Sequence, residues 1–324
     1  MIYSAAKRCL LIALVLSFLA SFCADKINSY WLFVSYNIGI SILMAVSLNL
    51  INGYTGQFSL GHAGFMAVGA YTSAVITNHF GELNVFTANA VFAIALLAGG
   101  LAAAVTGLLV GIPTLRLRGD YLAIVTLGFG EIIRVILQNM DAVGGARGLS
   151  VNHAWTNLFW TFGLAAVTIY VITSLVNSTY GRGFIAVRDD EIAAEAMGIN
   201  TTKYKVTAFI IGAFFAGIAG GLYAHSTLYL TPNGFGFMLS ITFVVMVILG
   251  GMGNTVGVII AAILLTLLNE GLRAMADIEH LPGFTVERPL SWLQDAHMII
   301  YSLLLIVLML TRPQGLFTFR KRNN

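Results

Sequence analysis

Long apolar runs separated by short polar stretches make up most of the chain. A run of roughly 20 apolar residues is long enough to cross the hydrocarbon layer of a bilayer as a helix. Runs that meet or approach this length lie at residues 9–24, 30–51, 61–79, 86–112, 121–138, 155–176, 206–228, 238–249, 256–275 and 296–311. The pattern predicts an all-α polytopic membrane protein, with about ten transmembrane helices in a single domain over residues 1–324.

Composition supports this fold class. The chain is 58% hydrophobic and 10% charged, with a mean hydropathy of +0.86, whereas soluble domains are about 25% charged. The net charge of +3 does not indicate nucleic-acid binding, because the basic residues cluster at helix ends rather than on one soluble face. Cys9 and Cys23, the two cysteines, have no metal-ligand or redox spacing, so we expect no metal site.

Lysine and arginine positions orient the helices, because cytoplasmic loops of membrane proteins are enriched in them. If the N-terminus is cytoplasmic, ten crossings place both termini and the loop at residues 178–205 in the cytoplasm. Twelve of the 17 basic residues then fall on that side: Lys7, Arg8, Arg116, Arg118, Arg182, Arg188, Lys203, Lys205, Arg312, Arg320, Lys321 and Arg322. The outer loops hold only Lys26, Arg147 and Arg288, so the asymmetry predicts that both termini are cytoplasmic.

Residues 181–205 form the densest run of charge, with eight of the chain's 31 acidic and basic residues. A segment this polar between membrane-spanning runs lies in water or against another protein. Its centre is predicted to be a short helix, which Asp189 or Asp190 caps, Glu191 supports through the helix dipole and Gly198 ends. A helix of about two turns is not stable alone in water, so we expect it to dock on a partner.

The two sides of this short helix differ. Ile192, Ala196 and Ile199 recur at helical spacing on one side, and Glu191 and Glu195 lie four residues apart on the other. Alanines at 193, 194 and 196 allow a partner surface to approach closely.

A glycine-rich segment at residues 52–71 follows the second apolar run. Its five glycines are Gly53, Gly56, Gly61, Gly64 and Gly69. In membranes, irregular backbone persists only where it is buried in protein or lines a wet cavity, and broken helices commonly form transport sites. We therefore expect a translocation pathway along Gly53, Tyr54, Gly56, Ser59, Gly61 and His62. The alternative is that the small residues only permit tight helix packing and that His62 is a hydrogen-bonded structural residue.

Two charged pairs lie inside apolar runs. Glu131 with Arg134, and Glu270 with Arg273, are each three residues apart and therefore share a helix face. Charges at this depth are costly and usually face protein or water. Either Glu131 and Glu270 border the outer end of a translocation route, or each pair is an internal salt bridge that neutralises itself.

A second glycine-rich break, VILGGMGNTVG at residues 247–257, echoes LNLINGYTGQFSLG at residues 48–61. In each case a span entering from outside reaches a break, from which the chain returns outward. Both breaks fall near the cytoplasmic side in the predicted topology. Because the match is mostly glycine, chance similarity is the alternative to an internal repeat.

Several of these motifs resemble one protein family. EIAAEAMG at residues 191–198 is similar to the E-x-A-A-x-x-x-G coupling motif of ABC-importer permeases. GYTGQFSLGHAGF at residues 53–65 resembles G-Y-x-G-x-x-S-x-G-H-x-x-F, a signature of the branched-chain amino acid (LivM-type) permeases. GEIIR, GGMG and RPQGLF follow in that family's order, so the resemblance covers most of the chain.

The resemblance implies one permease subunit of an ABC importer in a bacterial-type plasma membrane. The implied partners are a second permease, related to this chain, two ATP-binding subunits that carry ATP and Mg, and an extracytoplasmic solute-binding protein. The implied coupling residues are Arg188, Asp189, Asp190, Glu191, Ala193, Ala194, Glu195 and Gly198. Branched-chain amino acids are the leading substrates, and relatives carry other amino acids, amides or urea.

This chain has no G-x-x-x-x-G-K-[ST] phosphate loop, so we expect it to bind no nucleotide itself. It also lacks H-E-x-x-H and G-x-S-x-G, which argues against a membrane-embedded enzyme and against catalytic residues. The remaining alternative is a self-contained ion-coupled transporter of a small polar solute, which would also have broken helices and buried carboxylates. Such a transporter has no need of a docking helix.

Overall fold

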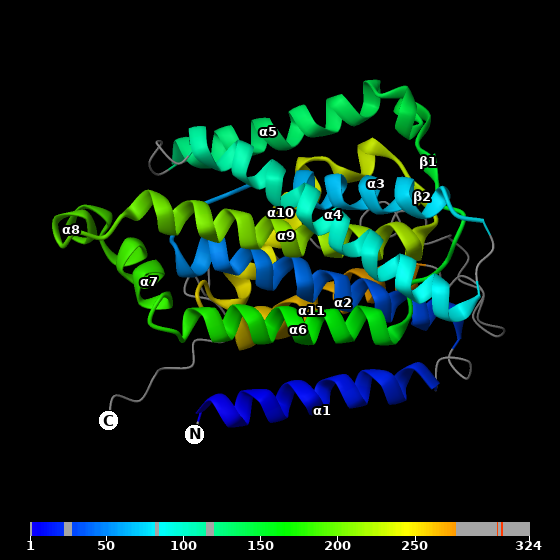
Figure 1. Ribbon diagram of the computed structural model, residues 1–324, viewed down its shortest axis with the longest axis horizontal. Helices are drawn as coiled ribbons and strands as arrows, with labels where there is room; N and C mark the ends of the chain where they lie inside the picture. The colour runs from blue at the N-terminus through cyan, green and yellow to red at the C-terminus, as the bar shows by residue number, and fades with distance from the viewer. Residues whose placement is uncertain are drawn as a thin grey trace, which may run out of the picture.

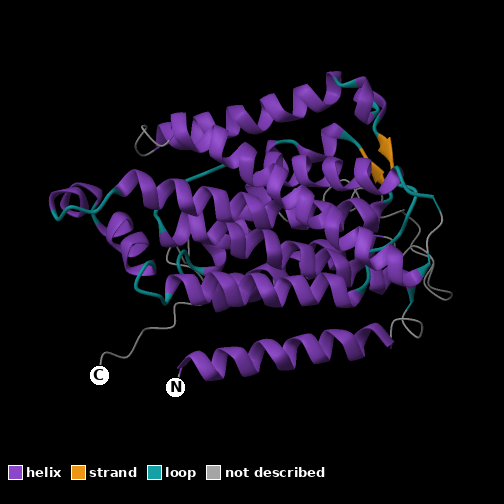
Figure 2. Ribbon diagram, viewed as in Figure 1, coloured by secondary structure: helices purple, strands orange, loops and turns teal. Residues whose placement is uncertain are grey.

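The computed structural model describes residues 2–22, 28–81, 84–114, 120–276, 303 and 306. These residues are helical almost throughout, and Figure 2 shows a single strand pair at one end. The α-helices are α1 (Ile2–Phe22), α2 (Ser29–Asn49), α3 (His62–Asn78), α4 (Val85–Thr114), α5 (Asp120–Asn139), α6 (Leu158–Val176), α7 (Gly181–Asp189), α8 (Glu191–Ala196), α9 (Thr201–Thr227), α10 (Phe237–Gly250) and α11 (Thr255–Ala276). A π-helical turn, Leu50–Tyr54, continues α2, and short 3-10 turns occupy Asp141–Val143, Gly145–Arg147 and Pro232–Phe235.

Within the described residues, six helices are long and apolar enough to cross a membrane. They are Ser29–Tyr54, Val85–Pro113, Tyr121–Asn139, Leu158–Val176, Thr201–Thr227 and Pro232–Gly250, and shorter apolar helices lie at Leu10–Phe22 and Thr255–Gly271. Every apolar run predicted between residues 9 and 275 coincides with a helix. The run at 296–311 lies outside the described residues except for 303 and 306. The prediction of an all-α polytopic membrane protein is confirmed.

Most long helices run roughly along the long axis of the molecule (Figure 1). α2 and α9 are the most buried spans and form the centre, whereas α5 is the most exposed. α3 and α4 pack on α9, and α1 packs along α6. Glycines let α3 and α9 approach closely, because a Cβ at Gly69 would collide with the backbone of Gly217. Small residues at helix contacts are the usual basis of tight packing in membranes.

The two ends of the bundle carry different structures (Figure 1). α7 and α8 project from one end, which we call the α8 end, and α1 begins at the same end. At the opposite end, strands β1 (Leu149–Ser150) and β2 (Tyr229–Leu230) pair antiparallel, with Leu149 opposite Leu230. The strand pair ties the loop after α5 to the loop after α9. The N-terminal helix therefore begins on the side of the charged loop, as the predicted topology requires.

The apolar run at residues 61–79 forms α3, which begins inside the bundle. His62, its first residue, is completely buried, and its Nε2 lies 2.8 Å from Oγ of Ser47. Ser47 lies seven residues before Tyr54, the last residue of the π-helical turn, which is about 10 Å along the helix. Residues 55–61 therefore return into the bundle without helical structure before the 17-residue α3 completes the crossing.

Candidate functional site

The charged loop contains the predicted short helix, α8. Asp190 caps it, because its Oδ1 accepts hydrogen bonds from the amides of Ile192 and Ala193 at 2.9 and 3.0 Å. Gly198 ends it with φ of +82°, a left-handed conformation that favours glycine. The amide of Gly198 donates to the Glu195 carbonyl and that of Ile199 donates to the Ala194 carbonyl, at 2.9 and 3.0 Å. Of the two predicted caps, Asp190 is the one used, and Gly198 as the helix end is confirmed.

A second helix in the loop, α7, was not predicted. Phe184 and Val187 are buried on one face of it. The Phe184 ring packs edge-on against Tyr204 of α9 with ring centroids 5.7 Å apart, and Tyr180 also contacts Tyr204. The signal was present in the sequence, because Gly183, Phe184 and Val187 recur at helical spacing among polar residues. The loop is therefore a pair of helices, and α7 fixes it to the bundle.

The glutamates of α8 face the bundle. Oε1 of Glu191 forms an ion pair with Nζ of Lys205 at 2.6 Å, and Lys205 is only 5% exposed. Oε1 of Glu195 accepts a hydrogen bond from Oγ1 of Thr201 at 2.7 Å. Both contacts attach α8 to the first turns of α9. They lie on the same side of the helix, as predicted from the spacing of Glu191 and Glu195.

The opposite side of α8 points into solvent. Ile192 is 67% exposed and Met197 is 82% exposed. Ala193 and Ala196 beside them are also exposed, whereas Ala194 is buried. We call Ile192, Ala193, Ala196 and Met197 the α8 outer face. It is apolar although it projects from the most polar loop of the chain, which is typical of a protein-binding surface.

The Glu191–Lys205 pair provides a test of how the loop is held. Replacing Glu191 by glutamine leaves the buried ammonium without its carboxylate and is expected to destabilise the loop by roughly 1–3 kcal/mol. Hydrogen exchange of the α7 and α8 amides should accelerate in the purified protein. The double replacement Glu191→Gln with Lys205→Met should restore most of the protection. Equal exchange in all three proteins would show that the pair does not stabilise the loop.

The two glycine-rich breaks meet at the base of this loop. A Cβ at Gly53 would collide with the amide nitrogen of Gly253, so the two backbones touch. The amide of Gly253 donates to Oδ1 of Asn49 at 2.9 Å, and the hydroxyls of Tyr54 and Thr255 lie 2.8 Å apart. We call this contact the glycine junction. The segments that the sequence related to each other are therefore direct neighbours.

Arg188, at the end of α7, packs against the glycine junction. A Cβ at Gly56 would lie 3.0 Å from Cγ of Arg188, and a Cβ at Gly253 would lie 3.1 Å from its Nη1. Both glycines have positive φ, +68° and +81°. Arg188 also pairs with Asp189, Nη2 to Oδ1, at 2.8 Å, and 37% of its side chain remains exposed. One side chain of the loop thus touches both breaks.

Polar side chains fill the interior beyond the π-helical turn. The amide of Ser59 donates to Oδ1 of Asn52 at 3.2 Å, and Oγ of Ser240 accepts from the amide of Ala63 at 3.0 Å near the start of α3. Gly61 precedes α3 and packs against the backbone of Thr126. Oγ of Ser59, Nδ1 of His62 and the side-chain amide of Gln57 are buried and have no hydrogen-bond partner among the described residues. A path for water or a polar solute would supply such partners.

The carboxylates within the spans differ in their surroundings. Glu131 pairs with Arg134 at 2.7 Å, and its Oε1 accepts from the amide of Phe237, the first residue of α10, at 3.1 Å. This geometry fits the internal-pair alternative and fixes the start of α10. Glu270 instead lines a cavity and accepts a hydrogen bond from the hydroxyl of Tyr30 at 3.0 Å. The predicted partner of Glu270, Arg273, has its side chain outside the described residues.

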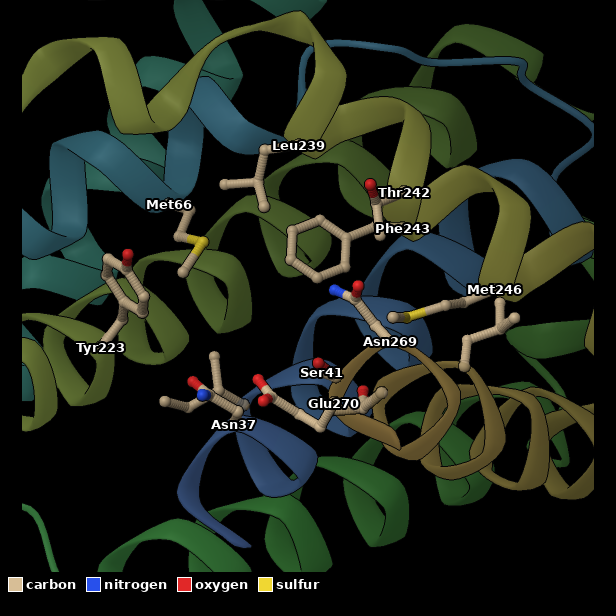
Figure 3. A pocket seen from close by; sticks show the side chains of 13 residues that line it. Asn37, Ser41, Met66, Tyr223, Leu239, Thr242, Phe243, Met246, Asn269 and Glu270 are labelled. Atoms are coloured by element: carbon tan, nitrogen blue, oxygen red, sulfur yellow. The ribbon is translucent and has the colours of Figure 1, made fainter. Parts of the chain in front are cut away.

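The cavity has a volume of about 190 Å³ and lies between α2, α3, α9, α10 and α11 (Figure 3). It is lined by Asn37, Ile40, Ser41, Met66, Tyr223, Leu239, Thr242, Phe243, Met246, Leu265, Thr266, Asn269 and Glu270. Among the described residues, no group of three or more His, Cys, Asp or Glu side chains is arranged to hold a metal ion. What the cavity offers is a carboxylate, side-chain amides, hydroxyls and an apolar wall.

Comparison with known proteins agrees with these features. The sequence model of the family "Branched-chain amino acid transport system / permease component" matches residues 30–309. The permease protein LivM of the high-affinity branched-chain amino acid transport system is 35% identical in both Salmonella typhimurium and Escherichia coli, over 86% of this chain and 67% of each relative. A probable branched-chain amino acid transport permease of Methanocaldococcus jannaschii is 26% identical over 86% of this chain and 90% of its own.

Proposed function

The chain belongs to the branched-chain amino acid transport permease family, and from that premise we propose that it is the multi-pass inner-membrane subunit of an ABC importer for branched-chain amino acids. It is a transport subunit rather than an enzyme. Its ATP-binding partners would supply the energy and a solute-binding protein would deliver the substrate. Support comes from the six helices of the described residues that are long enough to cross a membrane, from the buried polar interior and from the exposed apolar α8 outer face.

The proposed assembly contains a second, related permease, two ATP-binding subunits that bind ATP and Mg, and one extracytoplasmic solute-binding protein. This chain would cross the membrane about ten times with both termini in the cytoplasm, and residues 178–205 would form its cytoplasmic coupling loop. The excess of lysine and arginine on that side supports this orientation. So does the shared position of the start of α1 and of α8 (Figure 1).

The contact of Arg188 with the glycine junction is the observation that carries the proposed mechanism. An ATP-binding subunit would hold the α8 outer face, and its movement on binding or hydrolysing ATP would displace α7 and α8 together. Arg188 would pass this displacement to Gly56, in the break between α2 and α3, and to Gly253, in the break between α10 and α11. The bundle would then alternate between outward and inward access, with ATP biasing the two states.

Reconstitution of the whole importer in proteoliposomes tests the function. We expect leucine to accumulate only when ATP, the solute-binding protein and the ATP-binding subunits are present. Accumulation driven by a proton or sodium gradient, with this chain alone in the vesicles, would support the ion-coupled alternative instead. Failure of any ATP-binding subunit to purify with the chain would also contradict the proposal.

A further inference from the structure

The cavity between α2, α10 and α11 has two chemically different sides (Figure 3). Asn37, Ser41 and Glu270 lie along one side, which α2 and α11 provide. Met66, Leu239 and Phe243 lie across from them on α3 and α10. A solute that fills this space therefore meets a carboxylate on one side and mostly apolar side chains on the other, where Thr242 and Asn269 lie close to Phe243.

Among the described residues that line this cavity, Glu270 has the only charged side chain. It lies 15 residues along α11 from Thr255, which is about 22 Å at 1.5 Å per residue. Its hydrogen bond to Tyr30, the second residue of α2, places it near the end of that span as well. A carboxylate within a span is costly unless it faces protein, water or a cationic partner. The hydroxyl of Tyr30 occupies one acceptor position of Glu270. A carboxylate has about four such positions, so it has the capacity to accept an ammonium group as well.

The size of the cavity restricts the class of ligand. Its volume of about 190 Å³ is below the roughly 300–1,000 Å³ of pockets for drug-sized ligands. It suits a small molecule of amino-acid size. Urea and simple amides would fit, but they carry neither a cation for Glu270 nor a hydrocarbon group for Phe243 and Met66.

We propose that this cavity is a binding site for the transported amino acid within the membrane, and that it contacts both the charged groups and the aliphatic side chain of the substrate. Glu270 accepts the α-ammonium group, while the side-chain amide of Asn37 donates to the carboxylate. Met66, Leu239 and Phe243 enclose the aliphatic side chain. The inference rests on the proposed import function and adds to it a selectivity step inside the permease, separate from the one in the solute-binding protein.

The test uses the complete importer in proteoliposomes at a saturating concentration of leucine-loaded solute-binding protein. Glu270→Gln should lower leucine uptake by about tenfold or more, because it removes a charge-assisted hydrogen bond. Glu270→Asp, which keeps the charge, should retain a larger share of uptake. Retention of the ATP-binding subunits on affinity purification of both variants would show that the complex has assembled.

Phe243→Ala tests the apolar side independently. It should raise the uptake of phenylalanine relative to leucine by at least about fivefold, because loss of the ring enlarges the cavity on its apolar side. Met238→Ala is the matched control, since Met238 lies on the same helix and is 67% exposed, and its ratio should equal that of the parent. A purely structural role for Phe243 would lower both rates without changing their ratio.

Parent rates of leucine uptake in Glu270→Gln, or an unchanged phenylalanine-to-leucine ratio in Phe243→Ala, would overturn the proposed site. If Glu270→Gln does not assemble, the ratio in Phe243→Ala decides alone. Absence of ATP-dependent leucine uptake by the parent importer is a different result, because it would contradict the import function itself.

Discussion

Replacing Ile192 and Met197 together by aspartate is expected to abolish ATP-driven uptake, because these side chains form the most exposed part of the α8 outer face. They are 67% and 82% exposed, and a partner that covers them would account for their apolar character. Hot-spot side chains at the centre of an interface contribute about 2 kcal/mol or more, which is about 30-fold in affinity. The ATP-binding subunit retained on affinity purification of this chain should fall accordingly, and leucine uptake should fall with it.

The design separates docking from folding. Both side chains point away from the contacts that hold α8, which run from Glu191 to Lys205 and from Glu195 to Thr201. Asn177→Asp is the matched control, because it adds a carboxylate at an exposed position at the end of α6, outside α8. Its complex and its uptake should stay close to those of the parent. Full retention of the ATP-binding subunit by the double aspartate variant would show that α8 is not the docking helix.

The features that local sequence predicted are those that local interactions determine. Asp190 caps α8 and Gly198 ends it because capping depends on residues within one turn. The spans followed from hydrophobic length alone. α7 was missed because the dense charge of the loop obscured its narrow apolar face, which only becomes stable when Phe184 packs on Tyr204.

The site depended on contacts between distant parts of the chain, which no local pattern encodes. The start of α3 inside the bundle depends on the contact of His62 with Ser47 and on the cap from Ser240. The resemblance between the two glycine-rich breaks was visible in the sequence, but their contact and the position of Arg188 between them were not. Glu131 and Glu270 looked equivalent as intramembrane carboxylates. Their neighbours distinguish them, since Glu131 fixes α10 and Glu270 faces a cavity.

The glycines of the glycine junction allow close backbone contact, both between the two breaks and with the coupling loop. Two backbones touch at Gly53 and Gly253, and any side chain at Gly53 would separate them. Gly56 and Gly253 hold left-handed backbone conformations against the Arg188 side chain. Such a contact has little side-chain packing of its own to resist displacement. In the proposed mechanism the junction would move as a unit with the coupling loop, whereas an interlocked junction of large side chains would resist.

Arg188→Ala is expected to uncouple ATP hydrolysis from transport. The variant keeps the α8 outer face, so the ATP-binding subunits should still bind and hydrolyse ATP. The displacement of the loop would no longer reach Gly56 and Gly253. The number of leucine molecules imported per ATP hydrolysed should then fall at least about fivefold, which corresponds to the lower end of typical coupling energies. Simultaneous measurement of ATP hydrolysis and leucine uptake in proteoliposomes gives this ratio.

Arg182→Ala is the matched control, because Arg182 lies on the same helix with an exposed side chain and carries the same charge. Its ratio of leucine to ATP should equal that of the parent. If both arginine variants lose uptake and ATP-binding subunits equally, the loop acts through charge and docking alone. An unchanged ratio in Arg188→Ala would mean that the force enters the bundle elsewhere, with the pairing of Glu191 to Lys205 at the start of α9 as the remaining direct connection. A fall confined to Arg188→Ala, with the complex intact, requires that this side chain transmit the movement, because the control loses the same charge from the same helix and keeps docking and assembly.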